Sequence, residues 1–547
     1  MSLQVPYDAR LSACGVKHLA LYQAIRDSIV DGKLPPGAKL PSTRTLASLY
    51  GLSRGSVSVA YDMLAAEGYV RSAVGKGTYV AGEETRADVL LPGATNQAQA
   101  GAEPPGGAQA FEPELSAWGR RLRRGTQANE AANGAGVAGA DGDGAGGDGA
   151  GEMTEAEVGA VAGAEGEGHA GAISFTPRGM GERWFPWMSW KAAVSAEWRR
   201  RGPAEAAGRE AAAGGAELRR AIAGRLRRER GIPCEAEDIV VTGGSMQAIA
   251  LLAQLLLEPG RAAVAEDPCY SGTQRAIHAS GAALIPAPVD RHGIVPEDWR
   301  AEVLFVTPTR QFPTGGVLTY ERRMALLEWA QRRGAWIVED DYDSEFRWAG
   351  RPIEPLKALD RQERVVYVGS FSRTMRQEVR IGYAVLPPAL RAPFLLAKRL
   401  YDPYPTGLTE QRALADWMNQ GEYDRHLRRT RRIFNRLQGL LREELSRLAP
   451  LFDVHPADAG LLLFATWTGT PDQYDRYAEA CRRAGAGWGD GSVYAAAPRP
   501  DERTALFGFA HLDESDIVRG MRLMRETAAK LGLTGDTGGA RGGTGHA

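Results

Sequence analysis

Lysine is scarce in this sequence. Of its 66 lysine and arginine residues only eight are lysines, at positions 17, 33, 39, 76, 191, 357, 398 and 530. Arginine therefore supplies almost all of the positive charge, as expected from a biased codon pool. The scarcity matters wherever chemistry needs a primary amine, because the guanidinium of arginine stays protonated in proteins.

Cysteine and long apolar segments are also scarce. The four cysteines, Cys14, Cys234, Cys269 and Cys481, lie far apart and form no CxxC pair, which argues against a disulfide framework and a zinc site. The longest apolar stretch, residues 248–257, is too short to cross a bilayer. The N-terminus lacks the basic and apolar regions of a signal sequence. We therefore expect a soluble cytoplasmic protein that makes no contact with a membrane.

Neither sign of charge dominates. The formal net charge is -1 over 547 residues, and 44% of the residues are hydrophobic, which excludes a wholly disordered chain and an overall attraction to nucleic acid. Residues 131–170 differ sharply, with 25 alanines or glycines, eight acidic residues and no lysine or arginine. Such a segment buries too little apolar surface to offset its ordering entropy, so we predict a disordered linker there. The alternative is an acidic arm that competes with DNA for a basic face.

Residues 12–80 have the pattern of a small compact domain. Apolar residues at helical spacing predict a helix over residues 18–30. Ser42 and Ser53 are typical N-caps of two further short helices, which a glycine separates. Alternating segments on both sides of Gly75-Lys76-Gly77 predict a hairpin. This order of elements predicts a winged helix-turn-helix.

A winged helix-turn-helix places the N-terminal end of its second helix in the major groove of DNA. Residues 1–80 carry nine basic against five acidic side chains, so the charge is locally basic. The residues predicted to contact DNA are Ser42, Thr43 and Arg44 at the first helix start, Ser53, Arg54 and Ser56 at the second, and Lys76 at the hairpin tip. The alternative is a small helical domain whose charges are merely solvated.

From residue 172 to residue 530, short β-branched runs alternate with helical stretches. The pattern predicts strands at residues 239–241, 262–265, 303–306, 336–338, 365–368 and 381–385, and helices at residues 216–228, 246–257 and 320–333. Such alternation is typical of an α/β domain with a mostly parallel sheet, in which ligands bind at the carboxyl ends of the strands.

Polar motifs follow three of the predicted strands. Residues 242–245, Thr-Gly-Gly-Ser, join a strand to a helix in a way that lets backbone amides hold a phosphate, although an ordinary turn has the same composition. The acidic run 339–343 suits a metal ion, a helix cap or a protonated heterocyclic nitrogen. Residues 370–373, Ser-Phe-Ser-Arg, follow a third strand, and Arg380 comes seven residues later.

These motifs resemble two known families joined in one chain. LPSTRTLASLYGLSRGSVSVAYDMLAAEGYV, followed by GKGTYV, is similar to the GntR family of bacterial transcription regulators. VVTGGSMQAI, EDPCY, TPTRQFPTG, VEDDYDSEF and VGSFSRTMRQEVRIGY resemble the fold-type I aminotransferases, which use pyridoxal phosphate. Together they resemble the MocR/GabR-type regulators. The resemblance implies a GntR-type domain over residues 12–80, a linker over 81–171, an aminotransferase class I/II-like domain over 172–530 and a disordered tail over 531–547.

The resemblance also implies roles for individual residues. Four positions match those that hold the cofactor phosphate: Gly244, Ser245, Ser370 and Arg380. Tyr270 matches the aromatic residue stacked on the pyridine ring, and Asp340 matches the carboxylate that keeps the ring nitrogen protonated. Tyr342 and Gln311 match the phenol and the amide that reach the ring hydroxyl.

The match fails at one chemically important position. The family motif ends Ser-Phe-Ser-Lys, and that lysine forms a Schiff base with the cofactor, whereas this sequence has Arg373. Arginine keeps its proton and cannot attack the cofactor aldehyde. Other departures lie near it: Arg310 replaces a histidine, Met246 a polar residue, Arg209 a tyrosine, and Gln377-Glu378 a Pro-Gly pair. The substrate-carboxylate arginine has only Arg503 as a loose candidate.

The sequence therefore predicts a DNA-binding transcription regulator in the bacterial cytoplasm, acting as a homodimer on paired half-sites of an operator. Its fold-type I domain, with a mixed, mostly parallel sheet and a small C-terminal α/β subdomain, is expected to sense an amino acid or pyridoxal phosphate without covalent attachment, catalysis or a metal. Three alternatives stay open. They are another anionic ligand on Arg373, a vestigial pocket that only holds the dimer, and an active aminotransferase with an appended DNA-binding module.

Overall fold

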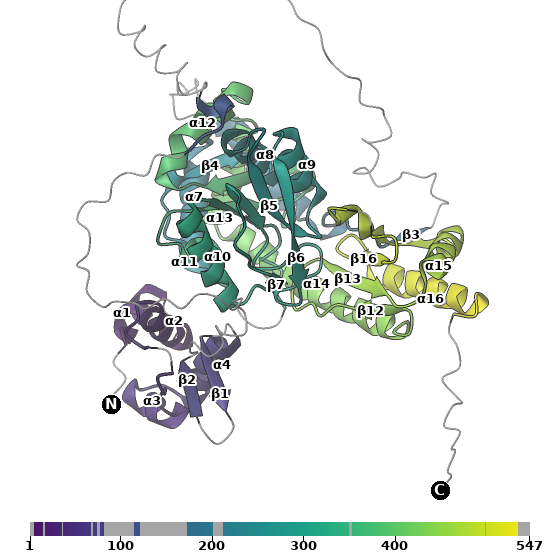
Figure 1. Cartoon of the computed structure of the whole chain (residues 1–547), viewed down its shortest axis with the longest axis horizontal. Coiled ribbons are helices and arrows are strands. Elements are labelled where there is room, and N and C mark those ends of the chain that lie inside the picture. The colour runs from purple at the N-terminus through teal and green to yellow at the C-terminus, as the bar shows by residue number, and fades with distance from the viewer. Residues whose placement is uncertain are drawn as a thin grey trace, which may run out of the picture.

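The computed structural model describes residues 5–14, 17–35, 37–66, 69–73, 77–80, 114–120, 172–200, 212–348, 353–497 and 499–533 (Figure 1). These residues form an N-terminal domain, called the reader (residues 5–80), and a larger domain, called the sensor (residues 172–533), which contains an eight-stranded and a four-stranded sheet. Most of the predicted linker and tail lies outside the described residues. No described helix combines the length and apolar character needed to cross a membrane.

The reader consists of four helices and a hairpin. Its elements are α1 (Tyr7–Cys14), α2 (Lys17–Val30), α3 (Thr43–Leu49), α4 (Arg54–Ala66), β1 (Val70–Ala73) and β2 (Gly77–Val80). Leu21, Ile25, Leu46, Val57 and Leu64 are completely buried in its core. The predicted helices and the predicted antiparallel hairpin are confirmed.

The large sensor subdomain is built on the eight-stranded sheet. Its strands are β4 (Ile239–Thr242), β5 (Ala262–Asp267), β6 (Ala283–Asp290), β7 (Gly293–Ile294), β8 (Val303–Val306), β9 (Trp336–Asp341), β10 (Val365–Ser370) and β11 (Gly382–Val385). Their order across the sheet is β4-β11-β10-β9-β8-β5-β6-β7. The strands from β10 to β6 pair in parallel, whereas β11 and β7 pair antiparallel to their neighbours. The predicted mixed, mostly parallel sheet is confirmed.

Helices cover both faces of this sheet. They are α6 (Trp187–Arg200), α7 (Ala216–Arg230), α8 (Ser245–Leu256), α9 (Ser271–Ala279), α10 (Tyr320–Arg333), α11 (Leu356–Leu359), α12 (Pro388–Tyr401) and α13 (Leu408–Asn419). Leu252 of α8 and Phe394 of α12 belong to one apolar cluster, and Trp329 of α10 to another, with alternate residues of the same strands. The central strands are therefore buried on both sides, as expected for parallel strands.

Residues 114–120, which the sequence places in the linker, pack against the large subdomain. Leu115 is buried in the same apolar cluster as α8. The Ser116 hydroxyl donates a hydrogen bond to the Gln254 carbonyl oxygen at 2.6 Å. The described part of the predicted linker is thus a component of the sensor surface.

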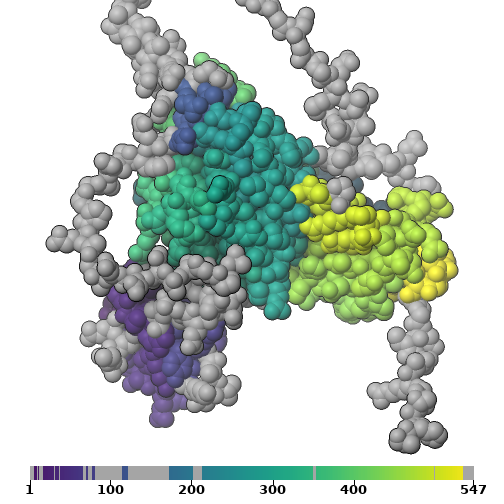
Figure 2. Space-filling model, viewed as in Figure 1, coloured from purple at the N-terminus to yellow at the C-terminus, as the bar shows by residue number. Residues whose placement is uncertain are grey.

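The small sensor subdomain contains the antiparallel sheet β12 (Phe452–Val454), β13 (Leu462–Trp467), β16 (Thr504–Gly508) and β15 (Gly489–Asp490). Its helices are α14 (Glu422–Ser446), α15 (Pro471–Arg483) and α16 (Glu514–Lys530). A parallel pair of short strands, β3 (Ile173–Ser174) and β14 (Ala486–Gly487), joins the start of the sensor to this subdomain. In Figure 2 the small subdomain lies at the right of the large one and the reader at the lower left.

A buried ion pair ties helix α7 to the end of strand β9. Arg230 at the end of α7 donates to Asp341 Oδ2 at 2.6 Å, and the Tyr367 hydroxyl donates to the same oxygen at 2.6 Å. Burial alone would lower the pKa of Arg230, but the neighbouring negative groups, Asp341 first, outweigh it and raise the pKa. Arg230 is therefore held in its ionised form inside the sensor.

Loss of this ion pair is expected to destabilise the sensor strongly. Replacement of Arg230 by alanine leaves the Asp341 carboxylate buried without its cation, which costs about 3–5 kcal/mol of unfolding free energy. Replacement of the exposed Arg220 of the same helix, which pairs with exposed Glu217, is expected to cost no more than about 1 kcal/mol. Denaturant unfolding of both variants checks this difference, and equal losses would contradict it.

Candidate functional site

The reading end of the reader is formed by the starts of α3 and α4. The Ser42 hydroxyl accepts a hydrogen bond from the Thr45 amide at 3.2 Å, and the Ser53 hydroxyl accepts one from the Ser56 amide at 3.0 Å. Both serines are thus the N-caps that the sequence predicts. The remaining amides of each first turn have no partner within their helix and are available to an anion.

The predicted DNA contacts at these helix starts lie on the reader surface. Ser42, Arg44, Ser53 and Arg54 are exposed, and Thr43 and Ser56 are partly exposed. The Tyr61 hydroxyl of α4 donates to the Pro41 carbonyl oxygen at 2.6 Å, which fixes α4 against the residue before the α3 cap. Lys76 lies outside the described residues. The structure therefore groups six of the seven predicted residues at two neighbouring helix starts.

The predicted cofactor site of the sensor, called the sensor pocket below, begins at the turn between β4 and α8. Gly244 has φ +110°, and a Cβ on Gly382 of β11 would lie 2.6 Å from the Gly244 carbonyl carbon. Glycine at both positions therefore lets the turn lie directly on the neighbouring strand. Ser245 is the first residue of α8, so its amide is among those that a helix start offers to an anion.

Arg380 approaches the same turn from the other side. Its backbone has φ +50°, and its guanidinium donates to the Gly243 carbonyl oxygen at 2.6 Å. A Cβ on Gly244 would come within 2.8 Å of the Arg380 guanidinium. The structure thus brings Gly244, Ser245 and Arg380 together, as the predicted phosphate site requires.

Ser370 is the last residue of strand β10, and Arg373 follows the strand. The Ser370 hydroxyl accepts from the Ser372 amide at 3.1 Å and lies 3.1 Å from the Ser372 hydroxyl. Arg373 makes no hydrogen bond or ion pair with any described residue. Its positive charge nevertheless acts on the pocket, since it opposes the rise in pKa of Asp340, Tyr342 and Tyr494.

Asp340, near the end of strand β9, has an unsatisfied carboxyl oxygen. Its Oδ1 atom is buried and has no hydrogen-bond partner. Burial, followed by the nearby negative charge of Asp341, raises the pKa of Asp340 to about 7. A buried polar atom without a partner is uncommon in proteins and often marks a functional position. The geometry fits a ligand that brings a protonated nitrogen or another donor to this oxygen.

Tyr342 is held by Arg310 rather than left free. The Arg310 guanidinium donates to the Tyr342 hydroxyl at 2.7 Å, to Asp343 at 3.2 Å and to the Leu462 carbonyl oxygen of β13 at 3.0 Å. A Cβ on Gly460, which has φ +84°, would lie 2.3 Å from the guanidinium carbon. The Arg310 side chain, which is larger than the histidine of the family motif, therefore fits only because residue 460 of the small subdomain is glycine.

An aromatic cluster forms another wall of the pocket. The ring of Phe312 contacts Tyr270 at 5.9 Å, Tyr342 at 5.4 Å and Tyr494 at 5.0 Å between centroids, each nearly perpendicular. Leu462 and Leu506 complete this apolar cluster. Phe312 lies within the motif TPTRQFPTG but was given no role from the sequence, and Tyr494 lies in none of the quoted motifs.

Gln311 makes its hydrogen bonds to residues of the neighbouring loops. Its amide nitrogen donates to the carbonyl oxygens of Pro268 and Phe312 at 2.7 and 2.6 Å, and its amide oxygen accepts from Thr314. The side chain is completely buried. Its hydrogen bonds therefore hold the loop after β8, and it makes none to Tyr342 in the described structure.

Glu266, the first residue of the motif EDPCY, is a further buried acid to which the sequence analysis gave no role. It accepts hydrogen bonds from the Thr307 amide and hydroxyl, while its Oε1 atom has no partner. Burial raises the pKa of Glu266 to about 7. Across the described residues, no group of three histidine, cysteine or acidic side chains is arranged to hold a metal ion.

Comparison with known families explains this combination of domains. Residues 17–80 match the family described as bacterial regulatory proteins, gntR family, and residues 196–483 match aminotransferase class I and II. The protein is therefore of the class of GntR-type regulators with an aminotransferase-like domain.

Two curated regulators resemble the chain over most of their length. The probable rhizopine catabolism regulatory protein MocR of Rhizobium meliloti is 32% identical over 95% of this chain and 95% of its own. The pyridoxine biosynthesis regulator PdxR of Corynebacterium glutamicum is 30% identical over 81% of each chain. The chain belongs to the MocR-type subfamily of GntR transcription regulators.

Solved aminotransferases share the fold of the sensor. The kynurenine aminotransferase of Pyrococcus horikoshii superposes with a TM-score of 0.61 at 24% identity, covering 70% of this chain and 95% of its own. The α-aminoadipate aminotransferase LysN of Thermus thermophilus gives a TM-score of 0.60 at 24% identity, covering 66% of this chain and 94% of its own. The predicted fold-type I architecture is confirmed.

The raised pKa of Asp340 predicts a measurable pH dependence. Between about pH 4 and pH 7 the folded protein keeps a proton that an unfolded aspartate has lost, so this group lowers the unfolding free energy by about 1.4 kcal/mol per pH unit as pH rises. Asp340→Asn is therefore expected to flatten the decline in stability between pH 5 and pH 7. Denaturant unfolding at several pH values measures the change in unfolding free energy, with exposed Asp453→Asn as the control. An unchanged pH profile in the Asp340 variant would contradict the assignment.

Proposed function

We propose that the sensor of this regulator binds pyridoxal phosphate, or a closely related anionic ligand, without a covalent bond, and that occupancy controls transcription. The unsatisfied, buried Oδ1 atom of Asp340 is the observation that carries this proposal. A pocket that had lost its ligand would have no need to keep an acid in such a position, because burial without a partner costs free energy.

The residues around Asp340 fit the cofactor. Gly244, Ser245, Ser370 and Arg380 would hold its phosphate, since amides, hydroxyls and a guanidinium are the groups that bind phosphate in proteins. Tyr270 would lie against the ring, and Asp340 would pair with the ring nitrogen. When bound, the cofactor supplies an aldehyde and an electron-withdrawing ring.

Arg373 would change how the pocket uses such a ligand. Because a guanidinium does not lose its proton near neutral pH, Arg373 provides no amine that attacks an aldehyde. It instead offers an unpartnered positive charge beside Asp340 and Tyr342. This charge would pair with a carboxylate or phosphate of the ligand, so the sensor would bind an anionic effector and would not catalyse transamination.

Replacement of Arg373 by lysine is expected to restore covalent chemistry. The wild-type protein should bind pyridoxal phosphate reversibly, and dialysis or borohydride treatment should leave no adduct. Arg373→Lys should give a visible absorption band and, after reduction, an adduct located at residue 373 by mass spectrometry. Arg376→Lys, which places a lysine three residues away at an arginine that pairs with Glu378, is the matched control.

Two outcomes would contradict this part of the proposal. A reduced lysine adduct in the wild-type protein, or transamination of any amino acid, would revive the alternative of an active aminotransferase with an attached DNA-binding module. Undiminished binding of pyridoxal phosphate by Asp340→Asn would remove Asp340 from the site.

The reader is proposed to contact an operator through the starts of α3 and α4, in a homodimer that reads paired half-sites. The exposed Arg44 and Arg54, together with the capped helix starts, support this assignment. A second copy would double the contacts to DNA and set the separation of the two half-sites.

Arg54→Ala is expected to weaken DNA binding. A contact of arginine with a base edge is worth about 1–3 kcal/mol, or roughly 5- to 150-fold in affinity. Lys17→Ala, which removes an exposed positive charge at the start of α2, should change affinity far less. Gel-shift titrations on a promoter fragment from the protein's own locus measure both, with sedimentation of the complex giving the number of chains bound. Equal effects of the two substitutions, or a monomer on DNA, would contradict the arrangement.

A further inference from the structure

Helix α14 of the sensor carries a row of exposed arginines. Its apolar side, which includes Leu427, Phe434 and Leu441, is buried in the core of the sensor. Its opposite side is exposed at Arg425, Arg428, Arg429, Arg432 and Arg436. Because residues three or four positions apart are neighbours on a helix surface, these five arginines form one stripe along α14.

Only the two outer arginines of the stripe have acidic partners. Arg425 and Arg436, at its two ends, form ion pairs with nearby glutamates. The three arginines between them, Arg428, Arg429 and Arg432, make no hydrogen bond or ion pair with any residue that the structure describes. The middle of the stripe is therefore a concentration of unneutralised positive charge.

This concentration is unfavourable for the helix itself. Like charges four residues apart on a helix repel each other and destabilise it. The stripe contains three such pairs, 425 with 429, 428 with 432, and 432 with 436. A negatively charged partner that covered the stripe would relieve this repulsion.

Helix α7 extends the positive surface beside the start of α14. Arg225 of α7 pairs with Asp424 of α14 at 2.5 Å, which holds the two helices side by side. Arg228 of α7 is exposed, lines a small cavity together with Asp424, and forms no ion pair with a described acid. The unpaired arginines of the two helices, called the basic face below, are Arg228, Arg428, Arg429 and Arg432.

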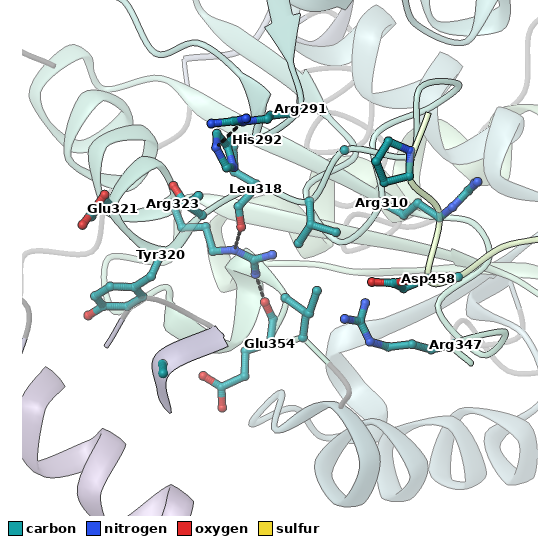
Figure 3. Close-up of a pocket in the computed structure, with 18 of the residues that line it drawn as sticks. Arg291, His292, Arg310, Leu318, Tyr320, Glu321, Arg323, Arg347, Glu354 and Asp458 are labelled. Carbon is teal, nitrogen blue, oxygen red and sulfur yellow. Dashed lines mark hydrogen bonds between the residues drawn. The ribbon is translucent and has the colours of Figure 1, made fainter. Parts of the chain in front are cut away.

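The basic face differs from the charged cavity between the reader and the sensor. That cavity, of about 960 Å³, has side chains of both signs in its wall, among them Arg291, Arg323, Glu321 and Glu354 (Figure 3). Positive groups there have negative groups nearby, whereas the four arginines of the basic face have none left to pair with. The partner of the basic face must therefore bring negative charge.

The chain itself contains a segment of the opposite charge. Residues 131–170, called the acidic arm, have eight acidic side chains and no lysine or arginine. The described chain resumes at Ala172, and the strand β3 that follows packs against α16, which in turn packs against α14. Forty residues can extend over roughly 130 Å at about 3.3 Å per residue. The length of the arm therefore does not prevent it from reaching the basic face.

We propose that the acidic arm docks on the basic face, with its carboxylates beside Arg428, Arg429 and Arg432. Its charge, its length and its attachment next to the neighbour of α14 favour the arm over a separate acidic protein. Attraction between exposed charges needs no apolar core, so a segment rich in alanine and glycine suits this role. The arm then competes with DNA, the other polyanion available to a regulator, for the basic face of the sensor.

Cross-linking of the full-length protein locates the arm. Arg429→Lys keeps the positive charge and supplies a lysine to a helix that has none. A carbodiimide joins this amine to a carboxylate that lies against it, and mass spectrometry identifies the joined peptides. We expect residue 429 to be joined to acids of residues 141–167, with a yield that falls roughly fivefold at about 1 M salt, because salt screens exposed charges. Arg275→Lys, at the single arginine of helix α9, is the matched control and should give no such product.

Non-specific DNA binding provides a second measure. Replacement of the eight arm acids by asparagine and glutamine should uncover the basic face. The logarithm of the affinity for a random duplex should then depend more steeply on the logarithm of salt concentration, by about 2.7 for three phosphate contacts at about 0.9 each. In a protein that also carries Arg428→Gln, Arg429→Gln and Arg432→Gln, replacement of the arm acids should leave this slope unchanged.

Three results would overturn the docking of the arm. The first is a lack of products between residue 429 and the arm, or arm products only with the reader lysines Lys17, Lys33 and Lys39, which would place the arm on the reader. The second is an unchanged salt slope when the arm acids are replaced. The third is a roughly tenfold or greater loss of affinity for a promoter fragment when the three arginines are replaced and the arm is intact, because DNA would then be the occupant of the face.

Discussion

The need to neutralise buried acids at the end of strand β9 shapes the sensor. Five consecutive residues, from Glu339 to Asp343, include four carboxyl groups, and burial makes their charges costly. The carboxyl of Glu339 accepts two backbone amides at the start of α11, while Asp341 and Asp343 each have a buried arginine partner. Asp340 and Asp343 each keep one buried oxygen without a hydrogen-bond partner. Asp340 differs from Asp341 and Asp343 because it forms no ion pair with an arginine among the described residues.

The cations that pair with Asp341 and Asp343 are both arginines, and arginine side chains determine the hydrogen bonds around the pocket. A guanidinium makes several directed hydrogen bonds at once, so Arg310 links Tyr342, Asp343 and strand β13 of the small subdomain. The same property makes Arg373 a poor substitute for a nucleophilic lysine and a good partner for an anion. A composition that favours arginine is thus consistent with the proposal of a pocket that recognises its ligand without covalent chemistry.

The sequence predicts the frame of the molecule better than the details of the pocket. Every predicted strand of the large sheet is present, because short β-branched runs between helices have few other solutions. Strand β6 was missed because Pro286 and Pro288 disfavour a ladder; it pairs along its length with β5 but with β7 only at its end. The contact between Phe312 and Tyr494 was missed because the two residues lie far apart in the chain, and only the fold brings their rings together.

Gln311 shows a second limit of sequence reasoning. The motif around it predicts an amide that reaches the ligand, and this stays a prediction; in the structure the amide nitrogen donates to the carbonyl oxygens of Pro268 and Phe312. Alignment of a motif gives the residue that occupies a position, whereas the direction of its side chain depends on local hydrogen bonds. The same reasoning explains why the caps Ser42 and Ser53 were predicted correctly, since a cap is defined by its own backbone.

Helix α4 extends from the reading end to the cavity between the two domains. Its 13 residues span about 20 Å at about 1.5 Å per residue, with the reading end at one extremity and the cavity facing the sensor at the other. A tilt of about 10° at the sensor end would swing the reading end by about 3.5 Å, close to the roughly 3.4 Å that separates successive bases along one strand. Small adjustments at the sensor surface are therefore large on the scale of DNA, and they would change which base the helix addresses.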